Sequence, residues 1–109
     1  MHELSLATEI MRIAADEIPE KWELKGLSIT VGGLSCVSPD SLVFCLRSLA
    51  GDGVEVKVRR TPAVLQCLEC GNEFETTDLY EPCSCGSLKR QVKSGREITV
   101  DNLEMKEIE

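Results

Sequence analysis

The sequence has almost no histidine, few aromatic residues and no long apolar run. Among its 109 residues there is one histidine, and Phe, Trp and Tyr together make up 4%, so any core must be mainly aliphatic. No apolar run approaches the roughly 20 residues that a membrane-spanning helix needs. The N-terminus also lacks the basic stretch that opens a secretory signal peptide. These absences lead us to expect a cytoplasmic protein.

Basic residues are in short supply as well. Lys and Arg number 12 against 19 Asp and Glu, which gives a formal net charge of −7. Nucleic-acid binding depends on neutralising phosphates, and anionic membranes attract basic surfaces. We therefore expect neither nucleic acid nor membrane as a partner. The remaining composition, 42% hydrophobic and 28% charged, is typical of a globular protein.

Apolar spacing predicts two helices. Residues 4–18 carry apolar side chains at helical intervals, and a second helix is predicted to run from Ser38 to about Ala50. Its start is a Ser-Pro-Asp sequence, in which Ser caps the helix, Pro fits the first turn and Asp interacts favourably with the helix dipole. The apolar stripe expected to be buried consists, in the first helix, of Leu4, Ala7, Met11, Ala14 and Ile18, widened by Leu6, Ile10 and Ile13. In the second helix it consists of Leu42, Cys45, Leu46 and Leu49.

Alternating apolar residues predict three strands, at 27–31, at 54–58 and from about residue 97. Gly32 and Gly33 follow the first of these strands, which suggests a bulge or a close approach of another backbone segment. The last strand comes after a cysteine-rich segment. Both ends of the chain are therefore expected to build one unit, with a smaller module inserted between two of its strands.

The inserted segment contains four of the six cysteines, spaced as Cys67-x2-Cys70 and Cys83-x-Cys85. Zinc is held by four tetrahedral thiolate or imidazole ligands, and two close pairs on facing turns supply that arrangement. Glycine follows each pair, which allows a positive φ that turns backbone N–H groups toward the sulfurs. The second pair is one residue shorter than usual, so we expect less room for such bonds there. The alternative is four free or disulfide-paired cysteines, which a reducing compartment disfavours.

This segment is too small to fold on hydrophobic burial alone. Its apolar residues between the cysteines are few, namely Leu68, Phe74, Leu79 and Tyr80, so a stabilising metal is expected. It carries five acidic residues and no basic residue from Cys67 to Cys85, which argues against a nucleic-acid-binding zinc ribbon. The predicted fold class is α+β: a three-stranded sheet with two helices, formed by residues 1–62 and 97–109, plus an inserted zinc-ribbon-like domain at 63–96.

The single histidine is His2, beside the α-amine of Met1. That amine, the backbone nitrogen of His2 and its imidazole can form fused chelate rings on one ion, and the backbone nitrogen of Glu3 or another donor can complete a square plane. Such nitrogen-rich sites suit Ni(II) or Cu(II). The alternative is an exposed histidine at a frayed terminus. Glu3 likewise has two candidate roles: it captures or orients a cation, or it is a helix-start acid favoured by the dipole.

Two cysteines fall outside these candidate sites. Cys45 lies on the predicted apolar face of the second helix, where it is expected to act as a small packing residue. Cys36 follows a predicted strand and is a candidate for exposure, either as an inert thiol or as an auxiliary soft ligand or redox thiol.

Several segments together resemble the hydrogenase maturation factor family HypA/HybF. They are the opening MHELSLA, the stretch LSITVGGLSCVSPDSLVFCL, the CLECG and CSCGS pairs, and residues 95–107. The resemblance implies a nickel metallochaperone, not an enzyme, that helps to load nickel into [NiFe]-hydrogenase, and in some organisms into urease. The implied sites are Ni(II) at Met1, His2 and Glu3, and structural Zn(II) at Cys67, Cys70, Cys83 and Cys85. The implied partners are a HypB-type GTPase, the hydrogenase large subunit and urease maturation proteins.

Two other functions fit parts of the same sequence. A zinc-ribbon adaptor that only docks proteins would leave His2 incidental, and a stoichiometric nickel titration separates this from a nickel carrier. Thiol redox chemistry at the cysteine pairs lacks the βαβ context in which such motifs occur. An enzyme is disfavoured because a closed four-cysteine shell leaves no open metal position for water.

Overall fold

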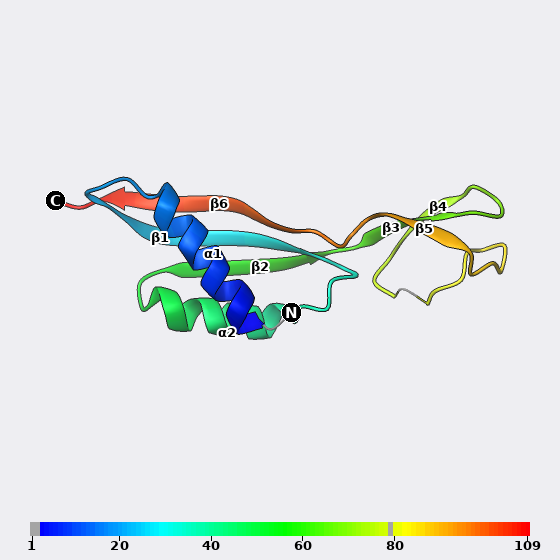
Figure 1. The fold of residues 1–109 in the computed structure, drawn as a ribbon, viewed down its shortest axis with the longest axis horizontal. Helices are drawn as coiled ribbons and strands as arrows, with labels where there is room; N and C mark the ends of the chain where they lie inside the picture. The colour runs from blue at the N-terminus through cyan, green and yellow to red at the C-terminus, as the bar shows by residue number, and fades with distance from the viewer. Residues whose placement is uncertain (1–2, 79) are drawn as a thin grey trace. The chain divides into compact units, whose positions relative to one another are not determined.

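The computed structural model describes residues 3–78 and 80–109, which form two compact units. The helical unit comprises the chain up to Thr30, Cys36–Arg59 and Thr99–Glu109, and the cysteine unit comprises Val31–Ser35 and Arg60–Ile98. The elements (Figure 1) are α1 (Glu3–Glu17), β1 (Trp22–Gly32), α2 (Pro39–Ala50), β2 (Glu55–Thr61), β3 (Ala63–Cys67), β4 (Glu73–Thr76), β5 (Arg90–Ser94) and β6 (Ile98–Glu107).

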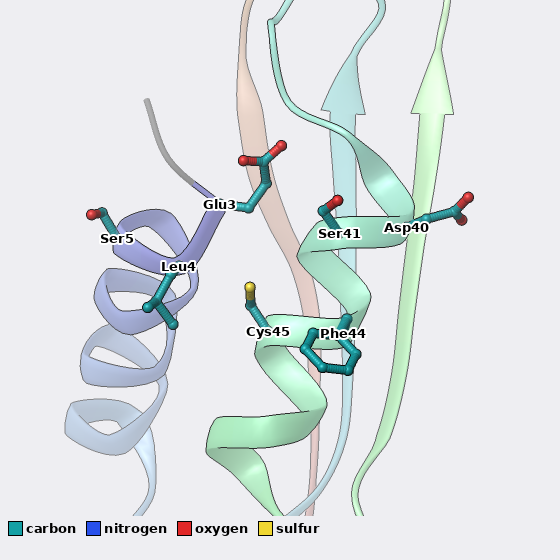
Figure 2. A pocket seen from close by; sticks show the side chains of 7 residues that line it. All are labelled: Glu3, Leu4, Ser5, Asp40, Ser41, Phe44 and Cys45. Atoms are coloured by element: carbon teal, nitrogen blue, oxygen red, sulfur yellow. The ribbon is translucent and has the colours of Figure 1, made fainter.

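The first sheet has three strands in the order β2-β1-β6, and both helices lie on the same face of it (Figures 1 and 2). The α+β class, the three strands and the two helices predicted from the sequence are confirmed. The buried hydrophobic residues among those described in the helical unit are all aliphatic, in keeping with the scarcity of aromatic residues: Ala7, Ile10, Ala14, Leu27, Ile29, Val37, Leu42, Leu46 and Val56. Within the described part of the chain, every helix is too short or too polar to span a bilayer.

The buried stripe of α1 is narrower than predicted. It is centred on Ala7, Ile10 and Ala14, whereas Leu4 is 57% exposed. Leu49, near the end of α2, is also exposed, at 44%. Both leucines occupy terminal turns of their helices, where the helix has little left to pack against. The prediction that these two side chains are buried was therefore wrong.

The predicted start of α2 is confirmed. Ser38 is the N-cap, with extended φ and ψ of −81° and 117°, and its Oγ accepts a hydrogen bond from the backbone N–H of Ser41 at 3.3 Å. Pro39 occupies the first turn, where its missing N–H costs nothing. At the other end, Gly51 has a φ of +83°, and its N–H donates to the carbonyl of Arg47 at 3.0 Å.

The cysteine unit contains a second antiparallel sheet in the order β4-β3-β5. Leu65 on the central strand is fully buried and lies opposite Phe74 on one side and Val92 on the other. The sequence analysis did not predict the two outer strands of this sheet. Both β4 and β5 contain a single apolar residue and so show no alternation of apolar and polar residues.

The glycine pair at the end of β1, Gly32 and Gly33, marks a close approach of backbone segments, as predicted. A Cβ on Gly32 would lie 2.3 Å from the carbonyl oxygen of Gly95, and a Cβ on Gly33 would lie 2.7 Å from that of Thr61. Two hydrogen bonds join the same segments, from Gly32 N–H to Glu97 O and from Leu34 N–H to Gly95 O, each 2.8 Å long. Side chains at positions 32 and 33 would therefore force these segments apart.

Candidate metal sites

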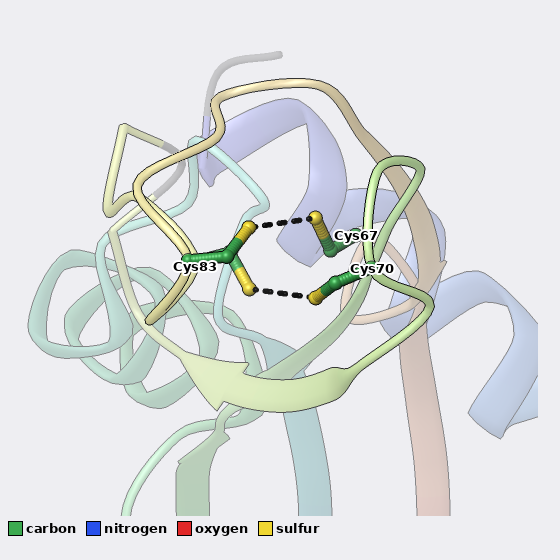
Figure 3. A group of neighbouring side chains, drawn as sticks. Cys67, Cys70 and Cys83 are labelled. Atoms are coloured by element: carbon green, nitrogen blue, oxygen red, sulfur yellow. Dashed lines mark hydrogen bonds between the residues drawn. The ribbon is translucent and has the colours of Figure 1, made fainter.

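The cysteine unit brings four thiols together. The Sγ atoms of Cys67, Cys70, Cys83 and Cys85 all lie within 4.8 Å of one another. Two facing pairs are closer, with Cys67 and Cys85 at 3.7 Å and Cys70 and Cys83 at 3.5 Å. Figure 3 shows Cys67 and Cys70, from one turn, facing Cys83 from the other. Four sulfurs placed tetrahedrally at the zinc–sulfur distance are about 3.8 Å apart. The donor set and its spacing therefore fit a tetrahedral zinc ion.

Each cysteine pair sits in a turn closed by backbone hydrogen bonds around its first cysteine. In the first turn, the Cys67 carbonyl accepts from Gly71 N–H at 3.0 Å, and Cys67 N–H donates to Asn72 O at 2.8 Å. In the second turn, the Cys83 carbonyl accepts from Gly86 N–H at 2.7 Å. The N–H of Cys83 completes that turn by donating to the Ser87 carbonyl at 3.0 Å. The second turn thus keeps the pattern of the first with one residue fewer.

The glycine that ends each turn has the backbone conformation predicted for it. Gly71 has a φ of +78° and Gly86 a φ of +88°. A Cβ at either position would meet nothing within 4 Å. The need for glycine therefore comes from the left-handed backbone alone and not from crowding.

Backbone N–H groups stabilise the thiolate form of the first cysteine in each pair. The pKa of Cys83 is lowered to about 6, mainly because the backbone N–H of Cys85 donates to its sulfur. The pKa of Cys67 is also lowered, mainly by the backbone N–H of Cys70, with Glu69 N–H adding to it. Cys67 thus accepts from two backbone donors and Cys83 from one, in keeping with the shorter second turn.

The pKa of the second cysteine in each pair is raised, in contrast to that of the first. Ser87 N–H lowers the pKa of Cys85, but its neighbours Cys67 and Cys83, together with burial, outweigh this and raise it to about 12. Asn72 N–H similarly lowers the pKa of Cys70, and the contact with Cys83 and burial reverse this into a raised value. The four thiols thus cannot all ionise together at neutral pH without a cation among them, which is the behaviour of a metal ligand set.

Burial divides the four cysteines in the same way. Cys67 and Cys83 are 1% and 4% exposed, whereas Cys70 and Cys85 are exposed. The exposed pair lines an open depression of about 520 Å³ together with Glu69, Gly86 and Ser87. One cysteine of each turn therefore anchors the cluster in the unit, and the other faces solvent.

The predicted nickel ligands Met1 and His2 lie outside the described residues. Glu3 is described: it is the first residue of α1, and its Oε1 accepts a hydrogen bond from the backbone N–H of Ser38 at 3.1 Å. A cavity of about 690 Å³ lies beside it, where α1 and α2 begin (Figure 2). The residues that line it are Glu3, Leu4, Ser5, Asp40, Ser41, Phe44 and Cys45.

Neither of the other two cysteines joins the four-cysteine cluster. All six cysteines belong to the described residues, and all are free thiols. Cys36 is exposed, and Cys45 is half-buried at the edge of the cavity beside Glu3. The sequence pattern gave no sign of this cavity, because it depends on how two helices pack and not on any motif.

Comparison with known proteins decides the family. The family model described as hydrogenase/urease nickel incorporation, metallochaperone, HypA matches residues 1–105. The chain belongs to the HypA family. The hydrogenase maturation factor HypA of Desulfatibacillum aliphaticivorans is 36% identical over 96% of this chain and 87% of its own length. That of Desulfosudis oleivorans is 34% identical over 98% of this chain and all of its own length.

The fold of the HypA family is present too. The solution structure of the Ni metallochaperone HypA from Helicobacter pylori superposes with a TM-score of 0.63, at 18% sequence identity, and covers 96% of this chain and 97% of its own. The resemblance predicted from the sequence is therefore confirmed. The family consists of metallochaperones that act in maturation, so this chain is a maturation factor and not an enzyme.

Proposed function

We propose that this HypA-family chain binds one Ni(II) ion at its N-terminus and helps to insert it into [NiFe]-hydrogenase during maturation. The observation that carries the proposal is the family match over residues 1–105, on a chain that opens with Met-His-Glu. A carrier must select its ion and also release it. A chelate of one amine, one imidazole and backbone nitrogens meets both needs, because its donors bind only after losing protons and release the ion when protonated.

The proposed nickel site consists of Met1, His2 and Glu3. Met1 supplies the α-amine, His2 supplies its backbone nitrogen and its imidazole, and Glu3 supplies a further backbone nitrogen. Four nitrogen donors in a plane suit Ni(II). In this role the nickel ion is cargo, and the protein gives it up to its acceptor.

The proposed zinc site consists of Cys67, Cys70, Cys83 and Cys85. With all four positions taken by thiolates, the metal would be structural and would have no open site for substrate. We assign nickel binding to residues 1–62 and 97–109, and zinc binding to residues 63–96. The support for this assignment is the separation of the cysteine cluster from α1 into different compact units.

The proposed partners follow from the family's place in hydrogenase maturation. They are a HypB-type GTPase, which would act with this chain, and the hydrogenase large subunit, which would receive the nickel. Urease maturation proteins are further candidate partners, since the family description names urease as well as hydrogenase.

The proposal is tested by nickel titration of protein with its native N-terminus and of the same protein with a short N-terminal extension. The extension removes the α-amine but leaves every side chain in place. We expect one Ni(II) per native chain and loss of that binding in the extended chain, with zinc content unchanged in both. Equal nickel binding by the two proteins would refute the N-terminal site.

A further inference from the structure

The N-terminus of α2 carries an incomplete capping pattern. In a capping box, the N-cap side chain accepts from the N–H of the third helical residue, and an acidic or amide side chain at that third position reaches back to the N–H of the N-cap. Ser38 fulfils the first half, since its Oγ accepts from Ser41 N–H at 3.3 Å. The third position, however, is itself a serine, which cannot span the return distance as a glutamate does.

Glu3 supplies the missing half from another helix. Its Oε1 accepts from the Ser38 backbone N–H at 3.1 Å, although the two residues are 35 positions apart in the chain. Figure 2 shows the Glu3 side chain leaving the start of α1 on the side that faces α2, whereas Asp40 points away from α1. The start of α1 is thereby tied to the start of α2 by a charge-assisted hydrogen bond.

We propose that the side chain of Glu3 is a positioning residue and not a nickel ligand: it completes the cap of α2 and so fixes Glu3, whose backbone nitrogen is one of the proposed nickel donors. The inference rests on the proposed nickel site and assigns separate roles to two parts of Glu3. Its backbone nitrogen is assigned to the ion, and its carboxylate is assigned to the N–H of Ser38.

The hydrogen bond between the Glu3 carboxylate and Ser38 is expected to strengthen nickel binding by fixing the start of α1. Helix ends fray, and a chelate that needs several donors in one plane loses affinity when its residues sample many conformations. Glu3 itself carries one of the proposed donors, so a carboxylate fixed on the Ser38 N–H restricts the backbone nitrogen that the chelate needs. The same bond also places the first residue of α1 over the cavity lined by Leu4, Phe44 and Cys45.

The test compares Glu3→Ala with Glu3→Gln in the full chain with its native N-terminus. The Gln side chain keeps an acceptor oxygen for Ser38 N–H but has no negative charge to offer a metal. Three quantities are measured: the Kd for Ni(II), the visible absorption spectrum of the bound ion, and the hydrogen-exchange rate of the Ser38 amide. Glu17→Ala is the control, because it removes an exposed carboxylate from the other end of α1.

We expect Glu3→Ala to raise the nickel Kd by about threefold to tenfold, the range that one net hydrogen bond supplies. Exchange at Ser38 should become faster, while the spectrum of bound nickel should stay unchanged because all donors are still present. Glu3→Gln should restore affinity and protection to near the unsubstituted values, and Glu17→Ala should change none of the three.

Two results would overturn the inference. One is a changed nickel spectrum in Glu3→Gln with affinity as weak as in Glu3→Ala, which would make the carboxylate a ligand. The other is unchanged Ser38 exchange in Glu3→Ala. Failure of the proposed function looks different: nickel binding would then survive the N-terminal extension of the unsubstituted protein.

Discussion

At the scale of single residues, nickel binding is expected to depend most strongly on His2, because this residue supplies two of the proposed donors. His2→Ala removes the imidazole and leaves only weak amine and amide coordination. We expect loss of stoichiometric Ni(II) binding in calorimetric titration, with one zinc per chain retained in metal analysis. Unchanged nickel affinity would contradict the assignment.

The same donors predict a pH dependence of nickel binding. The ordinary pKa is about 6.5 for an imidazole and about 7.7–8.0 for an α-amine, and both groups must be deprotonated to bind the ion. Nickel affinity should therefore fall steadily as pH decreases from 8 to 6. Zinc retention over this range serves as the internal control, and a nickel Kd that is flat across it would exclude these two donors.

A second residue-scale prediction concerns Asp101 on β6. This carboxylate accepts hydrogen bonds from the hydroxyls of Thr30 and Thr99, and Arg59 in turn donates to Thr30 at 3.0 Å. The bond from Thr30, then that from Thr99, lowers the pKa of Asp101, with the nearby Arg59 charge contributing. A pKa lowered by folding means that ionised Asp101 stabilises the fold above its unfolded pKa, and that this stability is lost as pH falls through the folded pKa.

Asp101→Ala should therefore lower the urea midpoint at pH 7 by more than it does in strong acid, below the lowered pKa of folded Asp101. Thr30 is buried, so its hydroxyl would also lose a partner. Glu107→Ala, which removes an exposed carboxylate further along β6, is the matched control and should show little effect at either pH. A difference between unsubstituted protein and Asp101→Ala that does not shrink in acid would show that the carboxylate charge is unimportant.

At the scale of elements, the two cysteine turns depend on backbone conformation as much as on sulfur. Gly86→Ala places a side chain at a φ of +88°, with open space around it, so the expected cost is the left-handed strain of about 1 kcal/mol. Gly53→Ala is the control, since it imposes a similar φ of +91° in the helical unit, outside both cysteine turns. Both variants should lose stability in urea, but only Gly86→Ala should lose zinc faster to a competing chelator. Equal zinc loss from the two would show that the turn geometry does not hold the metal.

Local rules predicted some elements fully and others not at all. The Ser38 cap, the helix that follows it and the close approach at Gly32 depend on neighbouring residues, so the sequence was sufficient to predict them. The strands β4 and β5 contain only Phe74 and Val92 as apolar residues, and they form because β3 lies between them. The bond from Ser38 to Glu3 joins residues 35 positions apart, and no periodicity encodes such a contact. The cysteine spacing predicted which thiols meet, although it did not predict which two would face solvent.

At the scale of the whole molecule, the two compact units differ in what stabilises them. The helical unit buries Ile10, Leu27, Ile29, Leu42 and Leu46 between its helices and its sheet. Among the described residues of the cysteine unit, the buried hydrophobic ones are Val31, Ala63, Leu65, Cys67 and Cys83. Two of these are proposed zinc ligands, so the proposed metal would replace much of the core that this unit lacks.

Removal of zinc from the full chain should therefore unfold one unit and spare the other. Without a metal, the lowered pKa of Cys83 leaves a thiolate on this buried side chain with no cation to neutralise it. Val31, Ala63 and Leu65 then bury too little apolar surface to hold three short strands together. Hydrogen exchange followed by mass spectrometry, with and without a chelator, should show faster exchange in β3, β4 and β5 and unchanged protection in α1 and α2. Added zinc should reverse the change. Loss of protection in both units together would show that their stabilities are coupled, and protection that persists in β3 would show that the metal is not what holds the cysteine unit folded.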